Sequence, residues 1–218
     1  EMGISDFGEM TRLAKIARPD TCVITNIGTC HLENLGDRDG VLKAKTEIFK
    51  FLRPDGHIVL NGDDDKLATV KGHEEIKPVF FGMDKDCQVY GDEIVSRGLK
   101  GMTCMIHMGD TAFKVDIPMP GRHMVSNALA AAAVGRLYGL NAEQIKNGCG
   151  QDVALKYVLD LRDFPGSPVE DKIVHDFSVI EKDPEVSVVV ETMGGLNPAY
   201  PFVKASLLAG KHVVTSNK

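Results

Sequence analysis

The 218-residue sequence has no tryptophan, few aromatic residues and no long uninterrupted apolar run. Without an apolar stretch of roughly 20 residues, it contains no candidate transmembrane helix. Its five cysteines are scattered and form no C-x-x-C pair, which argues against a disulfide framework and against a zinc site. No signal peptide is recognisable, and because Glu1 is not Met we expect it not to be a natural start. These absences indicate reduced thiols and a cytoplasmic protein.

The sequence also lacks an excess of basic residues. Residues 1–148 carry 18 Lys and Arg against 21 Asp and Glu, and the remainder carries 7 against 10. No basic face or tail results, which argues against nucleic acid or an anionic membrane as partner. We therefore expect nucleotides and other small-molecule substrates as partners.

Most of the chain alternates short β-branched runs with helical patterns, which predicts an α/β fold. In the first part we expect an incomplete parallel sheet with flanking helices. Between residues 87 and 118, short alternating runs separated by glycine predict a small antiparallel section. The expected elements are strands within 21–28, 54–65 and 76–82, and helices over 37–52 and 126–140.

A second α/β piece follows in the last quarter of the chain. We expect strands over 156–164 and 187–195, a helix over 197–210 and a further strand from 211. Strand, helix and strand at this spacing predict a truncated Rossmann-like β-α-β unit.

The stretch "GCGQDV" at 148–153 separates the two pieces. A dinucleotide-binding turn needs G-x-G-x-x-G after a strand and before a helix. Here the third glycine position holds Val153, a helical pattern precedes the turn and a strand pattern follows it. We interpret this stretch as a boundary, with one domain over 1–148 and another over 149–218.

Several chemistry-bearing residues of the first piece lie where strands should end, the usual ligand edge of an open α/β sheet. They are Glu1, Asn26, His31 and Lys45. A carboxylate and an imidazole near a phosphate site could hold Mg²⁺. Two simpler readings stay open, because a single histidine after a strand is more often a loop hydrogen-bonding group and a helical lysine often lies on a solvated face.

Four separated motifs in this part closely resemble the central ATP-binding domain of the Mur ligases. They are "EMG", "TNIGTCHLENLGDRDGVLKAKTEIF", "VLNGDDD" and "GRHMVSNALAAAAVGRLYGL", and they fall in the family's order over about residues 1–147. The resemblance implies ATP-dependent amide-bond formation in peptidoglycan precursor synthesis, by way of an acyl phosphate. Within the family, the branch that adds D-alanyl-D-alanine to a UDP-muramoyl tripeptide is most similar.

The same resemblance implies roles for individual residues. Glu1 and His31 would be Mg²⁺ ligands, and Lys45 would be a catalytic lysine that becomes N-carboxylated and approaches a second Mg²⁺. Asn127 would contact the adenine of ATP. Met124 stands where the family often has Asn, which changes the detail of that contact.

The phosphate-binding loop of the family, G-x-x-G-K-[ST], is found nowhere in the 218 residues. In the family this loop precedes "EMG", and a further domain follows "NAEQIKNG". We therefore expect this fragment to be inactive by itself.

The last part, from about 151 to 218, resembles the NAD(P)-binding domain of homoserine dehydrogenase through "VVETMGGLNPAYPFVKASLLAGKHVVTSNK". This resemblance implies that Arg162 meets the ribose or its phosphate, that Gly194 and Gly195 approach the nicotinamide half, and that Thr215 and Lys218 lie beside its reactive end. A plain strand-to-helix turn is the alternative for the two glycines. The glycine loop of that family should precede residue 151 and is not there.

Three hypotheses follow. The chain is part of a Mur ligase, using ATP and Mg²⁺; or it is a homoserine dehydrogenase, using NAD(P) to reduce aspartate semialdehyde; or it is a non-catalytic chimera of two truncated domains. For the molecule as written we favour the chimera, with the ligase as its functional label.

Overall fold

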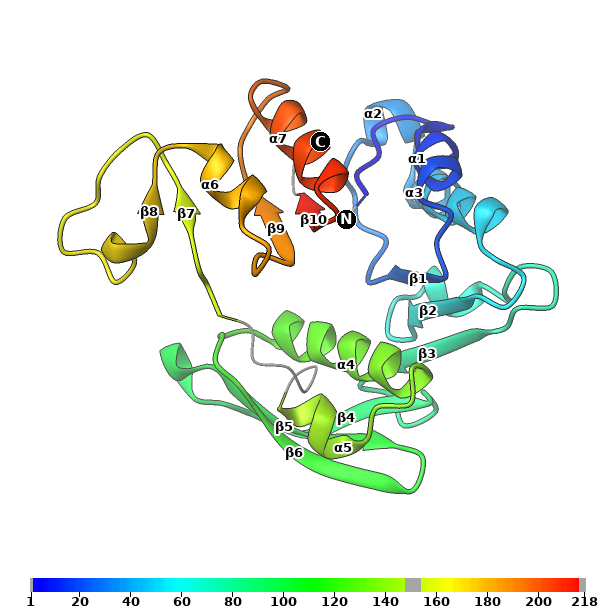
Figure 1. The fold of residues 1–218 in the computed structure, drawn as a ribbon. Helices are drawn as coiled ribbons and strands as arrows, with labels where there is room; N and C mark the ends of the chain where they lie inside the picture. Colours follow the sequence, from blue (N-terminus) through cyan, green and yellow to red (C-terminus); the bar gives the residue numbers. More distant parts are fainter. Residues whose placement is uncertain (1, 148–153, 216–218) are drawn as a thin grey trace. The chain divides into compact units, whose positions relative to one another are not determined.

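The computed structural model describes residues 2–147 and 154–215, and these fall into two units (Figure 1). The described residues of Ile4–Gln151 form the larger unit, and those of Asp152–Lys218, together with residues 2–3, form the smaller one. The predicted boundary at 148–153 lies outside the described residues. No helix in the described ranges is long and apolar enough to cross a membrane.

The larger unit is built on one six-stranded sheet of order β1-β2-β3-β4-β5-β6. The first three pairings are parallel, and the pairings β4-β5 and β5-β6 are antiparallel. The predicted α/β fold with a mostly parallel sheet is therefore confirmed, and the antiparallel section continues the same sheet. The strands are β1 (Thr21–Ile24), β2 (His57–Asn61), β3 (Pro78–Gly82), β4 (Val89–Ser96), β5 (Met102–Met108) and β6 (Thr111–Ile117).

Helices of the larger unit precede, connect and follow these strands. The predicted helix over 37–52 is a regular helix followed by a 3-10 segment, and α1 was not predicted. The elements are α1 (Glu9–Ala17), α2 (Leu32–Leu35), α3 (Arg38–Thr46), α4 (Arg122–Leu137) and α5 (Ala142–Lys146), with 3-10 helices η1 (Glu47–Phe51), η2 (Leu67–Thr69) and η3 (Gly98–Lys100).

The core lies between α4 and the sheet. The central strand β2 has Ile58, Val59 and Leu60 fully buried, as expected for a parallel strand covered on both faces. Along α4, small alanines let the helix approach the strands. Leu129 packs closely against Gly91 of β4, since a Cβ atom added at Gly91 would lie 3.2 Å from the Leu129 side chain. Burying this apolar face contributes about 25 cal/mol per Å² removed from water.

The helix α4 begins four residues before the predicted helix. Gly121 at its N-cap has a φ of 108°, a backbone conformation that favours glycine. Arg122 and His123 therefore belong to the first turn of α4, beside the ends of the parallel strands. This early start supplies two side chains to the pocket described below.

The smaller unit contains two separate two-stranded parallel sheets among its described residues, β7 with β8 and β9 with β10. The segment from β9 through α7 to β10 is a parallel β-α-β unit. Its elements are β7 (Val158–Leu159), η4 (Glu170–Lys172), β8 (Ile173–Val174), α6 (Phe177–Lys182), β9 (Val188–Glu191), α7 (Ala199–Leu208) and β10 (His212–Thr215).

The expected long strand over 156–164 is wrong, because only Val158–Leu159 is a strand. The carboxylate of Asp160 accepts a hydrogen bond from the backbone N–H of Arg162 at 2.9 Å. This local turn competes with strand pairing. The strand β7 pairs with β8, and β9 pairs with β10, so the described residues do not form a single Rossmann-like sheet.

Candidate functional site

A pocket of about 290 Å³ lies where the parallel strands end and α4 begins; we call it the strand-end pocket. Parallel strands present their carboxyl ends at one edge, and open α/β sheets bind ligands there. Amide, hydroxyl, carboxylate, guanidinium and imidazole groups converge on it. Its lining residues are Thr25, Asn26, Asn61, Asp63, Met83, Arg122, His123, Ser126 and Asn127.

Hydrogen bonds between strand ends hold the walls of the strand-end pocket. The side-chain amide of Asn61 donates to the carbonyl oxygen of Thr25 at 2.9 Å, which links the ends of β2 and β1. The carboxylate of Asp63 accepts the backbone N–H of Met83 at 2.8 Å and that of Asp84 at 3.1 Å. The pocket therefore has a rigid polar rim before any ligand enters.

Lys45 lies at the end of α3 and reaches the same edge of the sheet. Its Nζ donates a hydrogen bond to the carbonyl oxygen of Asn26 at 2.9 Å, and Asn26 also lines the strand-end pocket. Burial lowers the pKa of Lys45 below its ordinary value, although Cys30 and Asp64 act in the opposite direction. A lysine that loses its proton more readily is better able to act as an amine nucleophile.

The structure thus brings together two of the predicted site residues, Lys45 and Asn127, through Asn26. Asn127 is exposed on the second turn of α4 and lines the strand-end pocket. This placement is compatible with a contact to a bound nucleotide. Its expected role at adenine stays a prediction.

His31 begins α2 in a left-handed backbone conformation, with a φ of 59°. This conformation is uncommon for residues other than glycine, and such strain is often found at functional sites. The imidazole Nδ1 lies 3.7 Å from the carboxylate of Glu33. Glu1, the other predicted Mg²⁺ ligand, lies outside the described residues.

Across residues 2–147 and 154–215, no three His, Cys, Asp or Glu side chains gather as a metal site. This does not conflict with Mg²⁺, which keeps several waters and often binds through one or two protein oxygens plus substrate phosphates. His31 and a carboxylated Lys45 would offer an imidazole nitrogen and two oxygens to such an ion. The donor set therefore fits a phosphate-bound Mg²⁺ and not a closed structural metal site.

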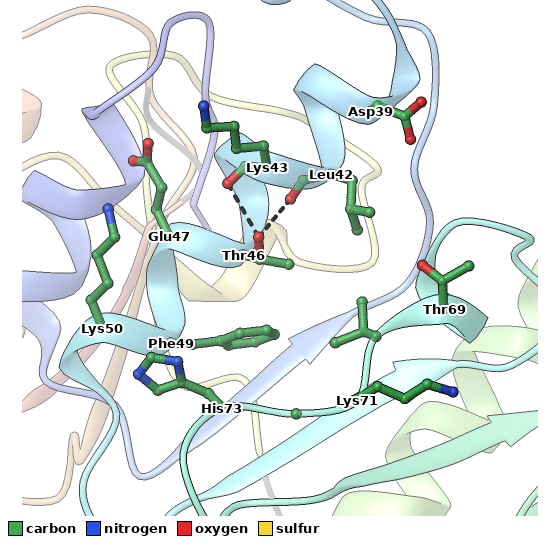
Figure 2. A pocket seen from close by; sticks show the side chains of 12 residues that line it. Asp39, Leu42, Lys43, Thr46, Glu47, Phe49, Lys50, Thr69, Lys71 and His73 are labelled. Atoms are coloured by element: carbon green, nitrogen blue, oxygen red, sulfur yellow. Dashed lines mark hydrogen bonds between the residues drawn. The ribbon is translucent and has the colours of Figure 1, made fainter.

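A larger cavity of about 600 Å³ lies between α3, η1 and the segment 69–73, and Figure 2 shows it from close by. The ring of Phe49 stands in it, and the hydroxyl of Thr46 donates to the carbonyl oxygens of Leu42 at 2.9 Å and Lys43 at 3.2 Å. None of the predicted site residues lines this cavity. Charged and polar side chains line this cavity too. The strand-end pocket is the better candidate because it lies at the carboxyl ends of parallel strands and contains Asn26 and Asn127.

In the smaller unit, the residues assigned to NAD(P) lie at two separate sheets, because Arg162 follows β7 whereas Gly194, Gly195 and Thr215 belong with β9 and β10. Arg162 donates from Nε and Nη2 to the carboxylate of Asp160 at 3.1 and 3.2 Å, so its fork is already occupied. Gly194 and Gly195 follow β9, with a φ of 80° at Gly195. The hydroxyl of Thr215 donates to the carboxylate of Glu191, and Lys218 lies outside the described residues.

Sequence reasoning did not assign roles to four residues of the strand-end pocket, namely Asn61, Asp63, Arg122 and His123. Two features of the sequence could have indicated them. The motif "NGDDD" follows a buried strand, and "GRH" precedes the alanine-rich helix. Both positions fall at the ligand edge once the strand order is known.

The fold and the pocket define an open α/β domain with its ligand site at the ends of parallel strands. The family model of the "Mur ligase middle domain" matches residues 1–135, and the chain belongs to that family.

Among curated relatives, the UDP-N-acetylmuramoyl-tripeptide--D-alanyl-D-alanine ligase of Bacillus subtilis (strain 168) is 36% identical over 148 residues. That match covers 68% of this chain and 31% of the relative. The ligase of the same name from Escherichia coli (strain K12) is 30% identical over 152 residues, with 68% and 33% covered. This chain therefore spans about a third of the length of these relatives.

Solved structures agree on the fold. MurF from Acinetobacter baumannii superposes with a TM-score of 0.63 at 23% identity, covering 99% of this chain and 54% of that protein. MurF ligase from Thermotoga maritima, solved in complex with ADP, gives a TM-score of 0.57 at 18% identity, covering 98% and 56%.

These comparisons bear on the interpretation of the last quarter of the chain. The resemblance to homoserine dehydrogenase, its NAD(P) cofactor and the idea of a chimera receive no support from them. The reported relatives are ligases, and the MurF fold extends over nearly the whole chain, including the smaller unit. A short β-α-β segment with a glycine turn is shared by many α/β folds, so this segment does not by itself indicate a dehydrogenase.

Proposed function

We propose that this chain is the nucleotide-binding core of an ATP-dependent ligase that adds D-alanyl-D-alanine to a UDP-muramoyl tripeptide. The observation that carries the proposal is the strand-end pocket, where Asn26 connects the lysine of α3 to Asn127 of α4. The similarity to ligases of that name supports this choice of substrates.

The reaction has two steps. A carboxylate oxygen of the tripeptide attacks the γ-phosphorus of ATP, the bond to ADP breaks, and an acyl phosphate forms. The amine of D-alanyl-D-alanine then attacks the acyl carbon, phosphate leaves, and the amine proton is released. Because phosphoryl transfer depends on positioning and charge stabilisation, the protein's task is to orient groups and to neutralise charge.

The residues of the site can divide this task among themselves. We assign Asn127 to the base of the nucleotide and Arg122, at the start of α4, to its phosphates, where guanidinium and phosphate match in charge. Lys45 gives up its ammonium proton, the neutral Nζ adds to the carbon of CO₂, and a second proton leaves the nitrogen, which gives a carbamate. With His31, this carbamate would hold Mg²⁺, which neutralises the phosphate oxygens when bound.

The proposal is tested by titrating the chain with ATP in the presence and absence of Mg²⁺, using calorimetry. We expect binding that requires Mg²⁺ and that weakens at least about tenfold, or about 1.4 kcal/mol, in Lys45→Met and in Asn127→Ala. The matched controls are Lys43→Met, on the exposed face of the same helix, and Asn34→Ala, on α2. Binding that is absent in the unaltered chain, or equally weakened by the controls, would contradict the proposal.

A further inference from the structure

The loop after β1, residues 25–28, is held by side chains that come from three other elements. The carbonyl oxygen of Thr25 accepts from Asn61, and that of Asn26 accepts from Lys45. At the next residue, Ile27, side chains hold both the backbone N–H and the backbone C=O. Four backbone groups of this short loop are thus satisfied by side chains and not by a strand ladder.

At Ile27 the two contacts come from an acid and a base. The backbone N–H of Ile27 donates to Oδ2 of Asp64 at 2.8 Å, and its carbonyl oxygen accepts from Nε of Arg38 at 2.9 Å. The side chain of Ile27 is itself buried, with 2% exposed. A residue whose backbone N–H, backbone C=O and side chain are all fixed has little freedom to rotate.

Asp64 is well suited to hold a backbone group in place. Its side chain is only 9% exposed, and its other oxygen accepts the N–H groups of Lys66 and Leu67, each at 3.0 Å. The guanidinium of Arg38 lies 3.6 Å away. A carboxylate this buried is stable only when hydrogen bonds and a counter-charge compensate its lost hydration, and here both are present.

Arg38 is fixed in turn by the next residue of the acidic loop. Its Nη1 and Nη2 donate to the two carboxylate oxygens of Asp65 at 3.0 and 2.6 Å. This two-pronged pairing leaves Nε aimed at the carbonyl oxygen of Ile27. Lysine could not do the same, because a single ammonium lacks the planar fork that makes both contacts at once.

We propose that Arg38 and Asp64 are positioning residues for Lys45: by holding the backbone C=O and N–H of Ile27, they keep the carbonyl oxygen of Asn26, which shares a peptide group with the Ile27 N–H, against the Lys45 ammonium at the edge of the strand-end pocket. Neither residue lines that pocket, so they act through the loop. The role of Lys45 in catalysis rests on the proposed function. The contacts of Arg38 and Asp64 with Ile27 are present in the chain without any ligand.

The test compares Asp64→Asn and Arg38→Gln with matched controls Asp20→Asn and Arg53→Gln, which alter an exposed ion pair of 2.9 Å elsewhere in the same unit. In Asp64→Asn, the single amide oxygen can still accept the N–H groups of Lys66 and Leu67. The amide NH₂ that replaces the other oxygen cannot accept the N–H of Ile27. Hydrogen exchange of the Ile27 amide is measured by NMR, with the buried amide of Val59 in β2 as internal reference. Acetylation of Lys45 by acetic anhydride is measured by mass spectrometry relative to Lys43.

In both variants we expect exchange at Ile27 to accelerate at least about tenfold and acetylation of Lys45 to rise several-fold, with Val59 and the controls unchanged. Unchanged exchange at Ile27 would overturn the proposal. Faster exchange at both Ile27 and Val59 would also overturn it, because that result shows a general loss of stability. If either variant does not fold, Arg38→Lys, which retains the positive charge, is expected to give a smaller acceleration at Ile27 alone.

Affinity for ATP with Mg²⁺ separates this inference from the proposed function. A loosened loop with weakened ATP binding supports both, and a loosened loop with unchanged binding overturns the positioning role. If the unaltered chain does not bind ATP, the proposed function fails, while the exchange and acetylation results still decide whether Arg38 and Asp64 hold Lys45 in place.

Discussion

The side chain of Glu47 is bound at the start of α1, where its carboxylate accepts hydrogen bonds from the backbone N–H of Gly8 at 3.0 Å and from the hydroxyl of Thr11 at 2.8 Å. A negative charge at a helix N-terminus is favourable, because the first N–H groups of a helix lack partners within it. Glu47 directly follows α3. It therefore ties α1 to the helix end that carries Lys45.

We predict that Glu47→Gln destabilises the larger unit by about 1–2 kcal/mol at pH 7, through loss of charged hydrogen bonds. Burial acts to raise the pKa of Glu47, but bonds from Thr11 and Gly8 outweigh it and lower the pKa below 4.5. A lowered carboxyl pKa gives stability that is complete above the unfolded value and is lost as pH falls through the folded value. The difference between variant and unaltered chain should therefore shrink below about pH 4.5 in urea unfolding.

The matched control for Glu47 is Glu75→Gln, at an exposed position of the same unit. It should change the midpoint of urea unfolding very little. A pH-independent effect of Glu47→Gln would show that the carboxylate charge is not what stabilises the contact.

We predict that Asp183→Asn lowers the unfolding temperature of the smaller unit at pH 7. Asp183 accepts from Lys156 at 2.7 Å and from the hydroxyl of Tyr157 at 2.8 Å. The hydrogen bond from the Lys156 ammonium is the largest influence, followed by those from the backbone N–H of Glu185 and the hydroxyl of Tyr157. Together they lower the pKa of Asp183 from 3.8 to about 2. The stabilisation is present above pH 3.8 and is lost as pH falls toward 2, so the two chains should converge in that range.

Calorimetric scans between pH 7 and pH 2 check this prediction, with the exposed Asp171→Asn as control. If Asp183→Asn unfolds at the same temperature as the unaltered chain at pH 7, the interaction with Lys156 and Tyr157 makes no measurable contribution.

We predict that Gly101→Ala destabilises the antiparallel section by about 4 kcal/mol or more. Gly101 has a φ of 99°, and an added Cβ would lie 1.9 Å from the carbonyl oxygen of Ile117. Gly98 in the same loop has a φ of 62° but no atom within 4 Å of an added Cβ. Gly98→Ala should therefore cost only roughly 1–2 kcal/mol, the price of the left-handed conformation alone. Urea unfolding of both variants decides whether the contact with the backbone of β6 sets the difference.

We predict that the pH profile of Lys45 acetylation has its midpoint below 10.5. Burial lowers the pKa of Lys45, with Cys30 and Asp64 only partly opposing it. The neutral amine is therefore available at a lower pH than for an ordinary lysine. The rate is measured at the Lys45 peptide by mass spectrometry across pH 7 to 11, and a midpoint at or above 10.5 would contradict the prediction.

Part of the site could be read from the sequence. Buried runs such as "TCVI" and "HIVLN" predict parallel strands through their β-branched residues, and the alanine-rich stretch predicts the helix packed on them. Since parallel strands share one ligand edge, Asn26 and Lys45 could be assigned to it. Boundaries were less certain, as the early start of α4 shows, because helix ends depend on caps such as Gly121.

The sequence alone determined the parallel strands of the larger unit, the helices over α3 and α4 and the mostly parallel character of the sheet, and it predicts Lys45 as a site residue. These predictions follow from local periodicity and from the spacing of motifs, both of which depend only on residues close together in the chain. Only the tertiary structure decided that Arg38 and Asp64 clamp Ile27, that Glu47 binds the start of α1, and that β7 pairs with β8. Those contacts join residues far apart in the chain, and their geometry exists only once the elements have packed together.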